Sequence, residues 1–245
     1  MKSVYGVVLV ALLSPLTACD QKQKSTDHLL LFTEADAEVE PGTVRVIVSA
    51  DYMRMDSGEN AEGYILLDRK QKVIYSVDRT NRQIITISDS GKELKPTVDL
   101  KLSEIKVDST QDMPAIGGKK PQHYQYKSGD ELCYESMSIK GLLPGYVQAM
   151  QEYNLILARD SVGALTSLPA DLRNGCDMAR HTFAPNRHLQ HGTPVVLWHK
   201  GVFVNTLVDY KENYKADKLL FELPKDYQTT SITELRSGAA GKFIQ

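Results

Sequence analysis

Four β-rich runs between residues 43 and 88 constrain the fold more than any other part of the chain. The runs are residues 43–56, 64–67, 73–77 and 84–87. Charged, turn-prone linkers at residues 68–71 and 78–81 separate the last three, a spacing typical of an antiparallel meander. Because apolar residues fall on both faces of these runs, we expect the sheet to be covered at least in part on both sides.

The apolar face of the first run changes partway along it. Residues 44–48 carry apolar side chains at even positions, whereas Met53 and Met55 are apolar at odd positions. A β-bulge near Ala50 and Asp51 would cause this switch and would curve the strand. Alternatively, the two methionines lie on a second, covered face.

The rest of the chain adds a hairpin, helices and further strands. A hairpin is expected over residues 123–139, a helix from Pro144, and a second helical piece after Pro169. Strands return at residues 194–199, 202–210 and 219–221. This order predicts an α+β fold: a curved, mostly antiparallel sheet (a half-barrel) with helices packed on its concave side.

The composition is that of one globular domain with a sizeable core. The 245 residues are 42% hydrophobic and 24% charged, with a formal net charge of -2. This charge argues against a nucleic-acid partner, because such proteins usually carry a basic surface.

The first residues read as a leader. Lys2 precedes an apolar run at residues 5–13 that is too short to span a bilayer, and Leu-Thr-Ala-Cys follows at residues 16–19. This pattern resembles the bacterial lipoprotein signal, which implies cleavage before Cys19, lipidation of Cys19 and a membrane-anchored protein facing the periplasm. An ordinary secretory leader cut after Ala18 is the alternative. Asp20 resembles an inner-membrane retention signal.

These features divide the chain into four parts. We expect a signal peptide at residues 1–18, the lipidated Cys19 with a tether at 19–42, one domain at 43–227, and a flexible tail at 228–245. Within the tether range, the apolar run at residues 28–32 is expected to be an edge strand or a packed arm.

Two cysteines remain after processing, Cys133 and Cys176. An even number in an oxidising compartment predicts a disulfide between them. Thiol chemistry is the alternative, but the chain contains no Cys-x-x-Cys pair.

No catalytic or cofactor motif stands out. The late histidines His181, His188, His191 and His199 match no standard metal spacing, so we expect no metal site. Ser103 and Lys106 match the Ser-x-x-Lys of penicillin-binding enzymes, but the partner motifs are absent. The sequence therefore favours a protein that is not an enzyme and carries no cofactor.

Two longer segments carry a family resemblance. They are YMRMD with GYILLDRKQKVIYSVDRTNRQIITI, and HGTPVVLWHKG with LLFELPKDY. Together they resemble relatives of the periplasmic lipoprotein-carrier superfamily, the Lol-type half-barrels. The resemblance implies an incomplete barrel over a helical lid, with an apolar hollow that in the carriers accepts acyl chains.

The expected helix after Pro144 offers a lid for such a hollow, because one of its faces is a stripe of Met, Tyr and Leu. The candidate ligand-binding residues are Met53, Met55, Tyr146, Met150, Tyr153 and Leu157. Our first hypothesis is a lipid-anchored module that binds an apolar ligand or an acylated partner. The second is an envelope assembly factor acting through protein–protein contacts, and an enzyme is the third.

Overall fold

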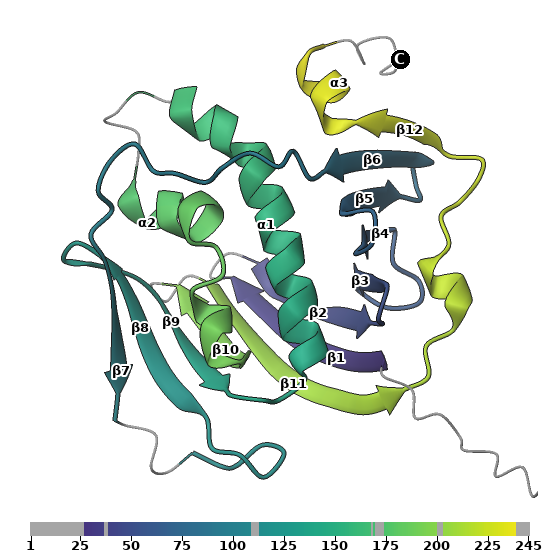
Figure 1. Cartoon of the computed structure of the whole chain (residues 1–245). Helices are drawn as coiled ribbons and strands as arrows, with labels where there is room; N and C mark the ends of the chain where they lie inside the picture. The colour runs from purple at the N-terminus through teal and green to yellow at the C-terminus, as the bar shows by residue number, and fades with distance from the viewer. Residues whose placement is uncertain are drawn as a thin grey trace, which may run out of the picture.

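One large sheet organises the molecule. The computed structural model describes residues 27–36, 39–108, 113–167, 169, 174–199 and 203–238. Within these residues one sheet has twelve strands in the order β12-β6-β5-β4-β3-β2-β1-β11-β10-β9-β8-β7, drawn in Figure 1. All neighbouring strands are antiparallel except β12 and β6, so the sheet is mixed.

The strands are β1 Asp27–Asp36, β2 Val39–Val48, β3 Tyr52–Asp56, β4 Gly63–Asp68, β5 Val73–Asp78, β6 Gln83–Ser88, β7 Leu102–Val107, β8 Gln122–Ser128, β9 Glu131–Ile139, β10 Thr193–His199, β11 Phe203–Tyr214 and β12 Gln228–Ser231. The α-helices are α1 Pro144–Ser167, α2 Gly175–Met178 and α3 Ile232–Arg236. None of these described helices has the length and apolar character needed to cross a membrane.

The expected α+β class and mostly antiparallel sheet fit this arrangement. Over the residues that the structure describes, the sheet is not closed into a barrel, since β12 and β7 are its two free ends. Its half-barrel curvature stays a prediction.

The expected meander is confirmed, and two matching turns explain it. Asp68 Oδ1 accepts a hydrogen bond from the Gln71 N–H at 2.8 Å, and Asp78 Oδ1 accepts one from the Asn81 N–H at 2.9 Å. The residues that follow, Lys72 and Arg82, both adopt positive φ angles, 55° and 54°. Each Asp therefore caps a tight reversal between paired strands.

The single long strand expected at residues 43–56 is wrong, because this stretch is the hairpin of β2 and β3. The Ser49 N–H donates to the Tyr52 carbonyl at 2.8 Å, and Ser49 Oγ accepts from the Tyr52 N–H at 3.0 Å. This turn places Val48 directly opposite Met53, on the same face of the sheet. Chain reversal, rather than a bulge or a second apolar face, thus causes the switch in the pattern.

The expected domain boundaries also differ from the structure. β1 falls inside the range expected as a tether, yet it lies in the middle of the sheet between β2 and β11. β12 and α3 fall inside the range expected as a tail. Residues 27–32 carry enough apolar side chains to be drawn into the core, and a Ser231–Glu234 capping box starts α3.

The strand expected at residues 219–221 is a 3₁₀ turn, Lys218–Phe221. Asp217 begins it by accepting a hydrogen bond from the Leu219 N–H at 3.0 Å. The surrounding segment, residues 215–227, lies against the face of the sheet opposite to α1. There Phe221, Leu223 and Tyr227 pack on the buried side chains Tyr64, Leu66, Val77 and Ile84. Both faces of this part of the sheet are therefore covered, as expected.

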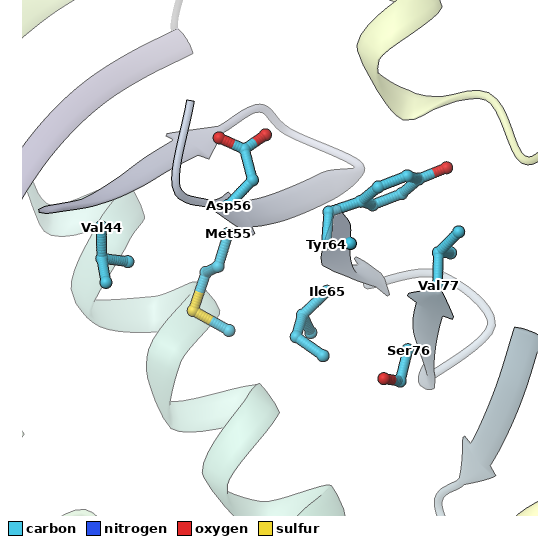
Figure 2. A pocket seen from close by; sticks show the side chains of 8 residues that line it. Val44, Met55, Asp56, Tyr64, Ile65, Ser76 and Val77 are labelled. Atoms are coloured by element: carbon cyan, nitrogen blue, oxygen red, sulfur yellow. The ribbon is translucent and has the colours of Figure 1, made fainter. Parts of the chain in front are cut away.

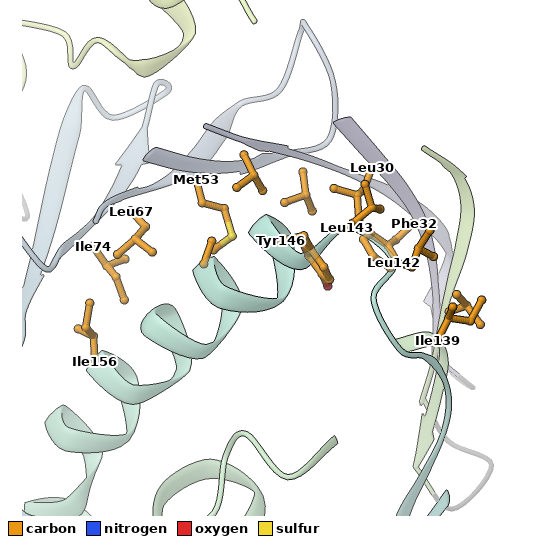
Figure 3. Packing of buried hydrophobic residues seen from close by; sticks show 14 residues of the cluster. Leu30, Phe32, Met53, Leu67, Ile74, Ile139, Leu142, Leu143, Tyr146 and Ile156 are labelled. Atoms are coloured by element: carbon orange, nitrogen blue, oxygen red, sulfur yellow. The ribbon is translucent and has the colours of Figure 1, made fainter. Parts of the chain in front are cut away.

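The main core lies between α1 and the sheet. Figure 3 shows Ile156 of α1 beside Ile74 of β5, and the Tyr146 ring of α1 lies 5.7 Å from the Phe32 ring of β1. The helix begins at Pro144 and contacts strands from β10 through β1 and β2 to β6. It therefore runs across the strands and holds both halves of the sheet together.

Candidate functional site

An open apolar concavity lies on strands β2 to β5 beside α1. It is a pocket of about 370 Å³. The residues that line it are Val44, Met55, Asp56, Gly63, Tyr64, Ile65, Ser76 and Val77. Figure 2 shows Met55 and Ile65 on the side of the helix, whereas Asp56, Tyr64 and Val77 point away. We call the part on the helix side the groove.

Strand register builds the floor of the groove from Met55, Ile65 and Ser76, and Ile85 extends the same row beyond the pocket. Met55 lies opposite Ile65, Ile65 opposite Ser76, and Ser76 opposite Ile85. Directly opposed residues share one face of a sheet, so these four side chains form a continuous row across β3 to β6. All four are only partly buried. We call them the open row.

The next row toward α1 is closed. Val48, Met53, Leu67 and Ile74 follow one another by the same register and are buried in the core beneath the helix. α1 thus covers one row of apolar side chains and leaves the neighbouring row accessible. The groove exists because the strands extend beyond the helix.

The six expected ligand residues all belong to the main core cluster. Met53 and Tyr146 are buried within it, and burial raises the pKa of the Tyr146 hydroxyl. Met150, Tyr153 and Leu157 are partly buried against it. Met55 is the member of this set that lines the pocket.

Sequence reasoning missed Ile65, Ser76 and Ile85 of the open row. The strand alternation in residues 63–68 places Ile65 and Leu67 on one face, and this was the available signal. The pattern does not say which of the two the helix covers.

A charged network closes the side of the pocket that faces away from α1. The Asp56 carboxylate accepts hydrogen bonds from Arg45 at 2.8 and 3.0 Å, from Arg54 at 2.7 Å and from the Gly58 N–H at 3.0 Å. Burial alone would raise the pKa of Asp56, but these donors outweigh it and hold the pKa below its usual range. The carboxylate is therefore satisfied and stays ionised.

The expected disulfide is confirmed. Cys133 and Cys176 are bonded, with their Cα atoms 5.1 Å apart, and the bond joins β9 to α2. In β8 and β9, Tyr126 pairs with Tyr134 and Lys127 with Leu132, so Cys133 has no opposed residue. This irregularity in the pairing marks the point where α2 is attached to the sheet.

Two of the late histidines, His188 and His191, each pack against a tyrosine ring. His188 lies edge-on to Tyr134 with ring centroids 5.8 Å apart, and burial lowers its pKa to about 4. His191 stacks on Tyr124 at 3.7 Å, and its Nε2 lies 2.6 Å from Glu104 Oε1. Across the described part of the chain, no group of three or more His, Cys, Asp or Glu side chains is arranged to hold a metal ion.

A second polar cluster, not expected from the sequence, surrounds Glu135. Its carboxylate lies 2.8 Å from His123 Nε2, and it accepts hydrogen bonds from Gln125 at 2.8 Å and Trp198 at 3.0 Å. Gln125 and Trp198 lie directly opposite Glu135 on the two neighbouring strands. Burial would raise the pKa of Glu135, but these contacts lower it overall. The cluster ties β8, β9 and β10 together.

Comparison with known proteins places the chain near several solved structures. No family model and no curated protein matches the sequence. An uncharacterised conserved protein from Thermus thermophilus aligns with a TM-score of 0.42 and 14% identity, over 84% of this chain and 91% of that one. PNGF-II aligns with a TM-score of 0.43 and 12% identity, over 86% of this chain but 32% of its own length.

A LolA superfamily protein from Nitrosomonas europaea is a further, weak structural neighbour. It aligns with a TM-score of 0.33 and 10% identity, over 82% of this chain and 91% of its own. Because these similarities are weak, we infer the function from the residues of the chain itself.

Proposed function

We propose that this protein is a lipid-anchored binding module of the periplasm that holds an acyl chain in the groove, and that it is not an enzyme. The observation that carries the proposal is the open row of Met55, Ile65, Ser76 and Ile85 beside a covered row of the same sheet face. Accessible apolar side chains in a concavity are what an apolar ligand requires.

The dimensions of the open row suit one acyl chain. Neighbouring strands are about 4.8 Å apart, so the three steps from Met55 to Ile85 span roughly 14 Å. One leaflet is half of a hydrocarbon core of about 30 Å, so an acyl chain in a fluid bilayer spans roughly 15 Å. Each methylene removed from water by the groove contributes about 0.8 kcal/mol.

The polar groups near the groove favour binding over catalysis. Asp56 is held ionised by Arg45 and Arg54 and points away from the open row in Figure 2. Ser76 supplies the hydroxyl of that row. We propose that it orients the ester or amide end of the ligand by one hydrogen bond.

The proposal includes the anchor and the shape of the sheet. Cys19 would carry the lipid, and Asp20 favours the inner membrane, although both lie outside the described residues. Figure 1 draws β3 to β6 and β7 to β9 on different sides of α1, which supports a half-barrel wrapped around the helix.

Displacement of a fluorescent fatty-acid analogue tests the proposal on a chain that begins at residue 20. We expect saturable binding that Ile65→Arg weakens at least about tenfold, because it puts a charge in the open row. Val208→Arg is the matched control, since Val208 is an apolar residue 56% exposed on β11 and does not line the pocket.

A folded wild-type chain that binds no such probe would overturn the proposal. The assembly-factor hypothesis would then take its place. Equal loss of binding in both variants would also contradict a site in the groove.

A further inference from the structure

The two free edges of the sheet differ. β12 is short and polar, with the sequence Gln-Thr-Thr-Ser, and α3 contacts both β12 and β6. Among the described strands, β7 pairs with β8 on one side only, and its residues from Leu102 to Lys106 are all exposed. An exposed edge offers unpaired N–H and C=O groups to another strand.

The β7 edge also carries apolar side chains. Ile105 is 42% exposed and Leu102 is 40% exposed. Soluble proteins usually protect such an edge, so an accessible one with apolar side chains marks a surface for strand pairing.

We propose that β7 pairs with β7 of a second copy of this chain, antiparallel and centred on Ile105, so that two sheets join edge to edge. In this register Glu104 of each copy lies opposite Lys106 of the other, and Ile105 lies opposite itself. A two-fold axis repeats each contact, as expected for a self-complementary interface.

Charge selects this register over its neighbours. In an antiparallel pair, directly opposed residues have their side chains on the same face of the sheet. A symmetric pairing that aligns the matching faces of the two sheets must therefore have its two-fold axis at a residue of the strand. Centring on Glu104 would oppose two carboxylates, and centring on Lys106 would oppose two ammonium groups. A pairing centred on Ile105 instead places Glu104 of each copy opposite Lys106 of the other, which gives two ion pairs.

The two charged side chains are available for these contacts. Glu104 Oε1 lies 2.6 Å from His191 Nε2, which leaves the second carboxylate oxygen free to accept. Lys106 forms no ion pair with another described residue and is exposed. The stacking of His191 on Tyr124 fixes the imidazole that contacts the Glu104 carboxylate, and this contact keeps Glu104 at the β7 edge.

Cysteine cross-linking of the full-length chain in cells tests the centre of the interface. Residues directly opposed in antiparallel strands have Cβ atoms about 4.5–5.5 Å apart, close to the reach of a disulfide. We expect Ile105→Cys to give a reducible dimer on a non-reducing gel. Ser103→Cys is the matched control, because the register places it opposite Val107, and it should give no dimer above the wild-type background.

Charge exchange tests the specificity. We expect Glu104→Lys and Lys106→Glu each to shift the full-length chain in mild detergent toward monomer, by at least about fivefold in dimer dissociation constant. Co-expression of the two variants under different tags should restore a mixed dimer, because each copy then offers the charges that the other lacks. This rescue also shows that neither variant failed to fold.

Three outcomes would overturn the proposal. They are a wild-type chain that stays monomeric at all concentrations, equal cross-linking at positions 103 and 105, or an Ile105→Cys adduct with a different protein.

Discussion

Arg54 and Asp56 lie two positions apart on β3 and form an ion pair that is withdrawn from solvent, with 2.7 Å between Arg54 Nε and Asp56 Oδ2. The Arg54 guanidinium also lies 3.6 Å from the ring centroid of Tyr64 and donates to the Leu220 carbonyl at 2.7 Å. This pair therefore links the hairpin of β2 and β3 to the C-terminal segment that covers the same face of the sheet.

We predict that Asp56→Asn lowers the free energy of unfolding by about 3–5 kcal/mol, because it leaves the buried Arg54 charge without its partner. Urea unfolding at neutral pH measures this. Asp226→Asn breaks the exposed pair with Arg82 and should cost no more than about 1 kcal/mol. Similar losses in the two variants would contradict the prediction.

The depressed pKa of Asp56 gives this interaction a pH dependence. An acid whose pKa is lower in the folded state stabilises the fold above its unfolded pKa, about 3.9, and loses that contribution as the pH falls. The difference in stability between wild type and Asp56→Asn should therefore shrink below about pH 4.

His188 predicts a second loss of stability at a higher pH. Its folded pKa is about 4 because burial and the nearby Arg180 disfavour the charged ring, whereas an unfolded histidine titrates near 6.5. The unfolded state therefore takes up a proton first, and stability falls as the pH drops from about 6.5 to about 4. His188→Gln should flatten the unfolding free energy over this window. A variant with the same slope as wild type would contradict the assignment.

Removing the disulfide should destabilise the protein by about 4 kcal/mol, since it closes a loop with a sequence separation of 43 residues. Comparing urea unfolding of wild type with and without a reductant measures the loss. A Cys133→Ser/Cys176→Ser variant should lie at the reduced midpoint and show no response to reductant. Free thiols at Cys133 and Cys176 in protein purified without reductant would contradict the bond.

Lipidation of Cys19 remains a prediction from the leader. Cys19→Ala should move the protein from the membrane fraction to the soluble fraction after a salt wash. Asp20→Ser keeps the cysteine and is the matched control, which should still sediment with membranes. Retention of Cys19→Ala in the membrane pellet would show that another feature holds the protein there.

The meander was predictable because its signals are local. Asp68 and Asp78 each precede a reversal, and the apolar residues between them alternate in a short window. The hairpin at Ser49 was missed because its turn lacks Gly and Pro, so the sequence reads as one strand with a change of face. Turn propensity alone does not reveal a reversal that a serine hydroxyl supports.

The groove was less predictable than the fold. Met55 and Met53 have the same residue type on the same strand face, yet one lies in the open row and the other under α1. Their difference depends on where the helix crosses the strands, and that is set by contacts between residues far apart in the chain. The pairing of β1 with β11, which makes β1 central, has the same origin.

The position of β1 also determines when the protein can fold. Leu30 of β1 pairs with Tyr210 of β11, so β1 gains this partner only after β11 has been synthesised. Pairings over such distances make folding slow, on the scale of milliseconds to seconds. A chain from which β11 has not yet emerged therefore lacks the pairing that completes the middle of its sheet.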